Sequence, residues 1–273
     1  MEHGRIFMKY TYEEMAKMID HSLLHPALTD QELEAGCRLA AQYGTATVCI
    51  KPYFVKRAAE LLKGTGVIVG GVIGFPHGNS TTESKRYETQ LACEDGAAEI
   101  DMVINIGKAL SGDWAYVERD VKAVCDEAHE RGAKVKVIFE NDYLDKGGAG
   151  LKSDDFKRRL CQLCERAGAD WVKTSTGFGF VKQTDGSYNY RGATEHDLRL
   201  MRESVSRKVQ IKAAGGVRDL DALIKTRELG ASRCGATATA AMLDEYRRRE
   251  AAEKAGKPAD PLKKDAAPGS GGY

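Results

Sequence analysis

Short β-rich segments alternate with longer helical segments along almost the whole chain. The segments between the strands repeat their apolar residues with helical periodicity, and TDQE (29–32), STTE (80–83) and TEHD (194–197) have the form of capping boxes. Eight strands alternating with helices predict a TIM (β/α)8 barrel in a single domain, with an open doubly wound sheet as the alternative. The predicted strands are residues 18–24, 46–52, 66–76, 98–105, 134–140, 170–177, 209–216 and 232–237.

Apolar and charged residues alternate within several of these strands. In the fourth strand, Ile100 and Met102 point one way and Asp101 points the other. Parallel strands covered on both faces are normally apolar throughout, so a charged face is unusual. In a barrel that face is the lumen, where charges must be paired or take part in chemistry. The same alternation places four further residues there: Cys49, Lys136, Lys173 and Lys212.

Lys173 and Lys212 fall at matching depths on neighbouring predicted strands, which lie ~4.8 Å apart. Two unit charges ~4 Å apart at an effective dielectric of 20 repel by about 4 kcal/mol, enough to lower one lysine pKa by roughly three units. A neutral amine can then attack a carbonyl and form a Schiff base. We expect Asp101 to assist Lys212 or a water more than Lys173, in proton transfer. The alternative is a structural Lys–Asp network.

Glycine-rich turns follow the last strands. Gly215 and Gly216 end AAGG, while Gly235, Ala236 and Thr237 belong to CGAT. Loops after strands seven and eight of a barrel commonly hold phosphate through backbone N–H groups and a helix N-terminus. Ordinary turn glycines are the alternative. Together with the lumenal lysines, these turns predict a substrate that carries both a carbonyl and a phosphate.

Composition narrows the functional classes. The 273 residues carry a formal net charge of +1, which gives no reason to expect a nucleic acid. No apolar run approaches the ~18–20 residues of a membrane span, and the polar N-terminus does not resemble a signal peptide. Seven scattered cysteines suit reduced thiols in the cytoplasm. Cys161 and Cys164 form a CxxC in a helical segment, so they are either buried helix cysteines or a redox or metal pair. His21 and His25 are not expected to bind metal, because their segment is a strand and a turn.

Six motifs, in order and spacing, resemble those of the deoxyribose-phosphate aldolases: IDHSLL, VIGFPHG, EIDMVINIG, KVIFE, VKTSTGF and IKAAGGVR, within about residues 18–243. The resemblance implies a metal-independent class I aldolase without a cofactor, whose substrates are a phosphorylated deoxy sugar and acetaldehyde. It further implies that Lys173 forms the Schiff base and that Lys212 and Asp101 transfer protons. The predicted substrate-binding residues are Cys49, Lys136, Thr174, Gly177, Gly215, Gly216, Gly235, Ala236 and Thr237. Cys49 also predicts inactivation by reactive aldehydes.

The chain departs from the family pattern in a few places. Thr237 and Ala238 replace the usual serine pair, and Asn141 replaces a threonine. The insertion 180–192 contains a DGS turn and is either a flap over the site or a surface ribbon. The rivals are another phosphate-binding barrel enzyme and a barrel that binds sugar phosphates without catalysis. A homodimer is an option that no residue pattern locates.

The expected organisation is an N-terminal extension (1–17), the barrel domain (18–254) and a flexible tail (255–273). The tail is rich in Pro, Gly and charge, which is typical of disorder. It ends in Tyr273, whose phenol is either an accessory group that reaches the barrel mouth or part of a solvated tail.

Overall fold

The computed structural model describes residues 8–256. Within them, eight parallel strands close into a barrel in the order β1-β10-β9-β6-β5-β4-β3-β2, so the predicted TIM barrel is confirmed and the open sheet is wrong. The barrel strands are β1 (Ile19–Leu23), β2 (Thr47–Ile50), β3 (Ile68–Ile73), β4 (Glu99–Val103), β5 (Lys134–Ile138), β6 (Trp171–Lys173), β9 (Gln210–Ala214) and β10 (Arg233–Ala236).

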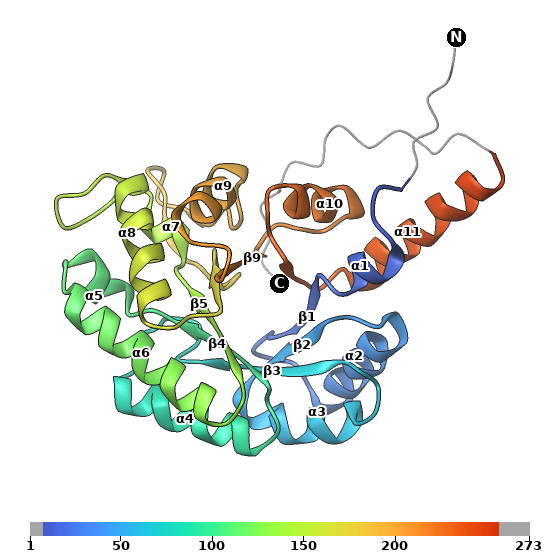
Figure 1. Ribbon diagram of the computed structural model, residues 1–273, viewed down its shortest axis with the longest axis horizontal. Coiled ribbons are helices and arrows are strands. Elements are labelled where there is room, and N and C mark those ends of the chain that lie inside the picture. The colour runs from blue at the N-terminus through green and yellow to red at the C-terminus, as the bar shows by residue number, and fades with distance from the viewer. Residues whose placement is uncertain (1–7, 257–273) are drawn as a thin grey trace, which may run out of the picture.

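Helices surround the barrel, and α1 and α11 lie side by side at one edge (Figure 1). The longer helices are α2 (Asp30–Tyr43), α3 (Val55–Leu62), α4 (Thr82–Glu94), α6 (Trp114–Glu130), α8 (Ser153–Arg166), α9 (Glu195–Ser204), α10 (Leu220–Glu228) and α11 (Thr239–Lys254). The shorter ones are α1 (Tyr12–Ala16), α5 (Ile106–Leu110), α7 (Asn141–Leu144) and the 3-10 turn Pro52–Phe54. No helix among the described residues is long and apolar enough to cross a membrane.

Local signals start several helices as predicted. Thr29 and Glu32 form a reciprocal capping box at α2, and Thr194 caps α9 by accepting from the Asp197 N–H. The expectation for STTE is wrong in detail, because Thr81 rather than Ser80 is the N-cap of α4 and accepts from the backbone of Ser84.

The main apolar core lies between the strands and the helices. Ile100, Met102 and Ile211 are fully buried in it, whereas Asp101 and Lys212 face the lumen and each other. The alternation along each strand therefore separates an apolar outer layer from a charged interior. Burying the outer layer supplies most of the driving force for folding, since apolar area contributes about 25 cal/mol per Å² removed from water.

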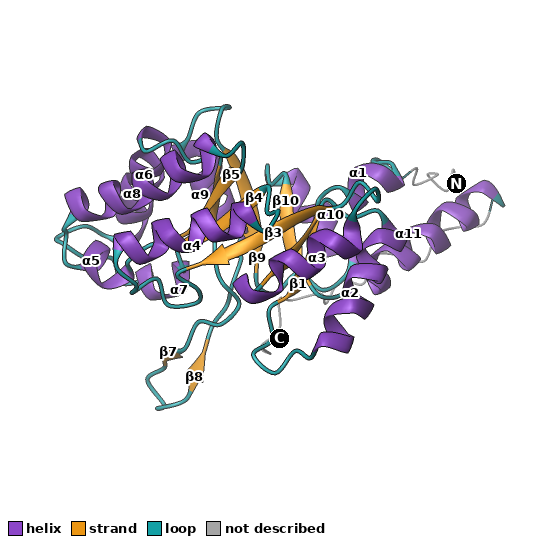
Figure 2. Ribbon diagram, turned by 90° about the horizontal axis from the view of Figure 1, so that it is seen from below, coloured by secondary structure: helices purple, strands orange, loops and turns teal. Residues whose placement is uncertain are grey.

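The insertion after β6 forms a hairpin, as DGS predicted. β7 (Val181–Lys182) pairs antiparallel with β8 (Tyr188–Asn189), and the Gln183 N–H donates to the Ser187 carbonyl. Figure 2 shows the hairpin extending outward from the barrel rather than lying across it. Its base is held by α7, where Asp142 accepts hydrogen bonds from the backbone N–H groups of Arg191 and Gly192.

Candidate active site

Three lysines surround one carboxylate in the lumen. Asp101 is fully buried on β4, and its Oδ2 accepts from Nζ of Lys173 at 2.7 Å and of Lys212 at 2.7 Å. Its Oδ1 accepts from Nζ of Lys136 at 2.9 Å. Backbone pairing sets Lys173 directly opposite Lys212, which is the matching depth expected from the alternation. The two amines therefore share a single oxygen atom.

The pKa values of the two paired amines are shifted in opposite directions. Burial lowers the pKa of Lys173 and the charge of Lys212 lowers it further, although Asp101 opposes both effects. Burial also opposes the charge of Lys212, but Asp101 and Asp20 outweigh it and raise its pKa well above the usual value. Lys173 is thus the amine that gives up its proton more easily, and Lys212 stays an ammonium.

One expectation about this cluster needs correction, and another stays a prediction. Repulsion between the amines was expected to be the main cause of a lowered pKa, but burial contributes more than Lys212 does. The expected assistance of Asp101 to Lys212 or a water in proton transfer stays a prediction; in the structure Asp101 contacts both amines at the same distance. The physical reason is that Lys173 and Lys212 are direct register partners on β6 and β9, so both amines reach the same Asp101 oxygen in the lumen.

The other predicted site residues fall into two groups. Lys136 is fully buried and engaged by Asp20, Glu99 and Asp101, so it belongs to an ion network beneath the mouth. The Thr174 hydroxyl donates to the Ala214 carbonyl and accepts from the Ala214 N–H, which joins β6 to β9. Neither polar group is free for a substrate in this structure.

Cys49 lies at the mouth in a small apolar cluster. It is 1% exposed, and its neighbours in the cluster are Leu24, Val72, Phe75 and Phe178. Burial raises the pKa of its thiol to about 11, so the group is protonated at neutral pH. This cluster gives one side of the mouth an apolar wall.

The glycine-rich turns lie at the carboxyl ends of β9 and β10. Gly215 and Gly216 both have φ of 86°, a conformation that glycine adopts without strain. Gly235 packs directly over Lys212, since an added Cβ would lie 3.5 Å from its Cε. Ala236 ends β10, and the following Thr237 is exposed. Helix α11 begins directly after this segment, and its N-cap Ala238 offers no side-chain acceptor to the first N–H groups.

The turn after β6 depends on a carboxyl group that the sequence reasoning did not use. Glu140 has the left-handed φ of 57° and is 1% exposed. It accepts from the Thr176 N–H at 3.2 Å and from the Thr176 hydroxyl, and burial raises its pKa to about 7. Gly177, with φ of 89°, completes the turn. In the predicted strand 134–140, Glu140 has the same parity as the lumenal Lys136, and this was the signal available in the sequence.

Asp20, Glu99 and Arg233 were also missed. Arg233 donates to Asp20 at 2.8 Å and to both Glu99 oxygens at 2.9 and 3.0 Å, and its guanidinium lies 5.3 Å from the Trp171 ring centre. Glu99 shares the parity of Asp101, and Asp20 follows the apolar Ile19 on a strand where His21 interrupts the alternation. Beside Arg233, β10 has only small residues, which give no alternation signal.

Other candidates carry no site. Cys161 and Cys164 are free thiols buried in α8, and His21 lies on β1 with its Nδ1 2.9 Å from the Thr239 hydroxyl. No group of three or more His, Cys, Asp or Glu in the described part of the chain is arranged to hold a metal. Tyr273 and nearly all of the expected tail lie outside the described residues.

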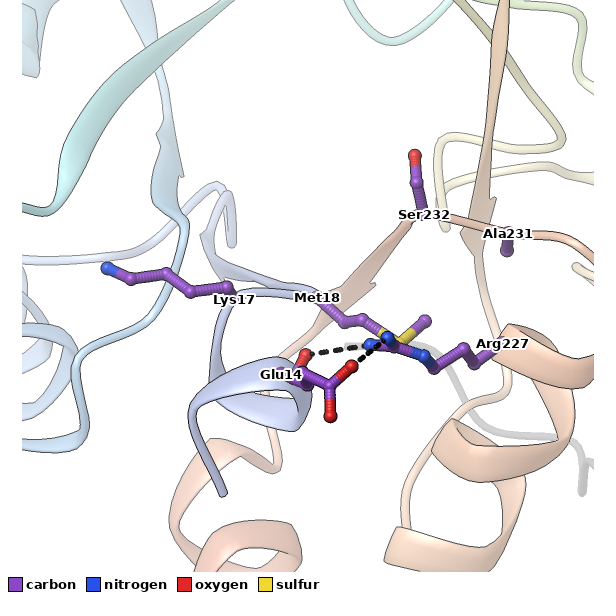
Figure 3. Close-up of a pocket in the computed structure, with 6 residues that line it drawn as sticks. All are labelled: Glu14, Lys17, Met18, Arg227, Ala231 and Ser232. Atoms are coloured by element: carbon purple, nitrogen blue, oxygen red, sulfur yellow. Dashed lines mark hydrogen bonds and ion pairs between the residues drawn. The ribbon is translucent and has the colours of Figure 1, made fainter. Parts of the chain in front are cut away.

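A pocket of about 390 Å³ lies at the amino-terminal end of the barrel, away from the loops just described. Figure 3 shows the Arg227 guanidinium bonded to Glu14 across it. This end of a TIM barrel normally serves stability rather than chemistry. Its lining residues are Glu14, Lys17, Met18, Arg227, Ala231 and Ser232.

Comparison with known proteins agrees with this geometry. The model of the DeoC/LacD family aldolases matches residues 14–243. The chain belongs to the DeoC/LacD aldolase family. The chain is similar to a deoxyribose-phosphate aldolase of Rhodopirellula baltica, with 50% identity over 88% of this chain and 92% of that protein. Another, from Thermococcus gammatolerans, is 44% identical over 87% of this chain and 98% of its own.

The barrel is also similar to solved structures of aldolases. An aldolase called QR15 is 33% identical, with a TM-score of 0.76 over 87% of this chain and 97% of its own. A tetrameric deoxyribose phosphate aldolase from Aeropyrum pernix is 29% identical, with a TM-score of 0.74 over 87% of this chain and 92% of its own. Membership of this family makes the chain an aldolase that acts on small molecules.

Proposed function

We propose that this protein is a class I deoxyribose-phosphate aldolase with Lys173 as its nucleophile. It reversibly splits 2-deoxy-D-ribose 5-phosphate into acetaldehyde and D-glyceraldehyde 3-phosphate. The observation that carries the proposal is one amine with a lowered pKa, held 2.7 Å from a carboxylate that a second, charged lysine also contacts. The full-length relatives that bear this name support the choice of substrate.

The chemistry follows from these positions. The neutral Lys173 amine attacks the C1 aldehyde of the open-chain sugar to form a carbinolamine. A proton donated to its hydroxyl lets that group leave as water, and the product is an iminium ion. A base removes the proton of the C3 hydroxyl, the C2–C3 bond breaks, and its electron pair forms the enamine while glyceraldehyde 3-phosphate leaves. Protonation at C2 and addition of water then release acetaldehyde and the amine. Asp101 and Lys212 serve these proton transfers, acting through water.

The phosphate is assigned to the glycine-rich turns. Gly215, Gly216, Gly235 and Ala236 allow the backbone to approach an anion closely, and the uncapped start of α11 adds N–H donors and the positive end of its dipole. Thr237 is the hydroxyl donor that remains where the family usually has two serines. The cytoplasmic location, the role in deoxynucleoside breakdown and a homodimer belong to the same proposal; light scattering tests the last.

The test is reduction of the imine with borohydride in the presence of acetaldehyde, followed by peptide mass mapping. A two-carbon adduct on Lys173, lost in Lys173→Met, is the expected result. Lys212→Met is the matched control, because it removes the neighbouring amine and leaves the proposed nucleophile. An adduct on Lys212 alone would reassign the nucleophile, and a protein that binds the sugar phosphate without any adduct would be a binding barrel.

A further inference from the structure

The lumenal charges form one connected network that reaches from the amino-terminal end of the barrel to the mouth. Every member contacts at least one opposite charge, and Arg233 and Lys173 occupy the two ends. At one end Arg233 binds Asp20 and Glu99, and at the other Lys173 binds Asp101. The members of this lumenal network are Asp20, Glu99, Asp101, Lys136, Lys173, Lys212 and Arg233.

The network has four basic members and three acidic ones. Fully ionised, it would hold one excess positive charge in a buried space, which is costly because burial disfavours uncompensated charge. If one basic member gives up a proton, the net charge of the network becomes zero. Lys136 touches three carboxylates and Lys212 two, whereas Lys173 touches only Asp101, an anion that the other two lysines also share. The proton is therefore given up by Lys173.

We propose that Arg233 and Glu99 are positioning residues that set the charge state of Lys173 from the far end of the barrel. Arg233 is the fourth positive charge, which the three carboxylates of the network cannot balance. Without the negative charge of Glu99, the excess would be two positive charges instead of one. Neither touches the reacting atoms, and both act through Asp20, Lys136 and the ion pairs above them. The inference rests on the proposed role of Lys173 as the nucleophile.

The path between the two ends is short. The backbone pairs Arg233 with Lys212 and Lys212 with Lys173, so two strand spacings, about 10 Å, separate the outer positions. At an effective dielectric of 20, one unit charge at that distance changes a pKa by about one unit. Arg233 is largely shielded from solvent, with 15% of its side chain exposed, so water weakens this influence only in part.

Few other titratable groups face the two ends. Lys173 is faced by Asp101 from β4, Lys212 from β9, Cys49 from β2 and Glu140 after β5. Of these, Glu140 titrates nearest neutrality, with a pKa of about 7, and Glu140→Gln therefore serves as a background that removes its titration. Arg233 is faced by Asp20 from β1, Glu99 from β4 and the uncharged Trp171 ring from β6.

The experiment measures the rate of imine formation with acetaldehyde between pH 6 and 10, trapped by cyanoborohydride and mapped to Lys173. Arg233→Met removes a positive charge, so the pH at which the rate is half-maximal should rise by about one unit. Glu99→Gln removes a negative charge, so it should fall by about one unit. The double variant has the same net charge in the network as the wild type, so its midpoint should return to the original value.

Arg233→Lys is the matched control, since it keeps the charge and loses only the forked geometry; its midpoint should stay near that of the wild type. Circular dichroism identifies a variant that fails to fold. If Arg233→Met does not fold, the midpoints of Glu99→Gln and of the double variant still test the inference. Unshifted midpoints, or shifts in the same direction for Arg233→Met and Glu99→Gln, would overturn the inference. Absence of any adduct on Lys173 in the wild type would instead overturn the proposed nucleophile.

Discussion

Glu140 shows how one residue can hold a functional turn against a cost. Its carboxyl is buried beside the backbone of Thr176, three residues after Lys173, and its own backbone is left-handed. Non-glycine residues in this conformation cost roughly 1 kcal/mol or more and persist where the surroundings fix them. The hydrogen bonds from Thr176 are what fix it here, so Glu140 ties the end of β5 to the turn after β6.

Burial raises the pKa of Glu140 from 4.5 to about 7, which makes its contribution to stability depend on pH. The folded protein holds this proton more tightly than the unfolded chain, so the contribution is complete below pH 4.5 and is lost as the pH rises to about 7. The free energy of unfolding of the wild type minus that of Glu140→Gln should fall by roughly 2–3 kcal/mol between pH 5 and pH 8. Urea unfolding at both pH values measures it, and a difference independent of pH would contradict it.

Cys49 predicts a slow, pH-dependent inactivation by unsaturated aldehydes such as crotonaldehyde. The thiolate is the reacting form, and a pKa of about 11 leaves little of it at pH 7. The inactivation rate should rise about tenfold per pH unit below 11, and Cys49→Ala should abolish it. Cys93→Ala is the control, because that thiol is half-buried outside the lumen. Equal inactivation of Cys49→Ala and wild type would count against this role.

At the scale of elements, the β7–β8 hairpin is anchored against the turn that follows β9. Gly192, where the hairpin returns, has φ of 74° and packs directly on Gly215, whose carbonyl accepts from the Ala193 N–H. The candidate phosphate turn after β9 is therefore in direct contact with the segment that ends the β7–β8 insertion. Two aromatic rings are exposed on the hairpin: Phe180, at its base, and Tyr188, with ring centres 5.9 Å apart.

Gly192→Ala should raise KM for 2-deoxyribose 5-phosphate about tenfold or more, since an added Cβ would lie 2.6 Å from the Gly215 oxygen and displace that turn. Turnover of unphosphorylated deoxyribose should change much less. Steady-state kinetics with both sugars measure this. Gly186→Ala at the hairpin tip is the matched control: its φ is 86°, but no atom lies within 4 Å. An equal loss of activity with both sugars would contradict a role of this turn in binding the phosphate.

For the whole molecule, a buried ion pair outside the lumen joins two helices to the barrel. Lys85 on α4 donates to Asp120 on α6 at 2.6 Å and to the Val103 carbonyl at 2.9 Å, and both side chains are fully buried. The Thr82 hydroxyl also donates to Asp120 at 2.9 Å. This pair contributes to stability only as a unit, because either charge alone would be buried without its partner.

Asp120→Asn should lower the free energy of unfolding by about 3–5 kcal/mol, since it leaves the Lys85 ammonium buried without its anion. Aldolase activity well below the unfolding temperature should change little. Urea unfolding and a steady-state assay measure the two effects. Asp126→Asn is the control, because its pair with Lys122 is 2.7 Å long but exposed, and its loss should cost less than about 1 kcal/mol. Equal costs for the two variants would contradict the role of burial.

The sequence by itself determined the alternation of strands and helices, the closed barrel class and the faces of the strands. It placed Asp101, Lys136, Lys173 and Lys212 in the lumen because alternation is a local property with a period of two residues. The glycine turn after β9 was equally readable, because the positive φ angles of Gly215 and Gly216 select glycine locally.

Only the tertiary structure decided which charges meet. Asp101 contacts Lys173 and Lys212, which are 72 and 111 residues away, and Arg233 reaches Asp20 and Glu99 from the last strand. Such contacts depend on the register and closure of eight strands, which no local pattern encodes. The depth of burial, which lowers the pKa of Lys173 and raises that of Glu140, likewise exists only once the helices surround the barrel.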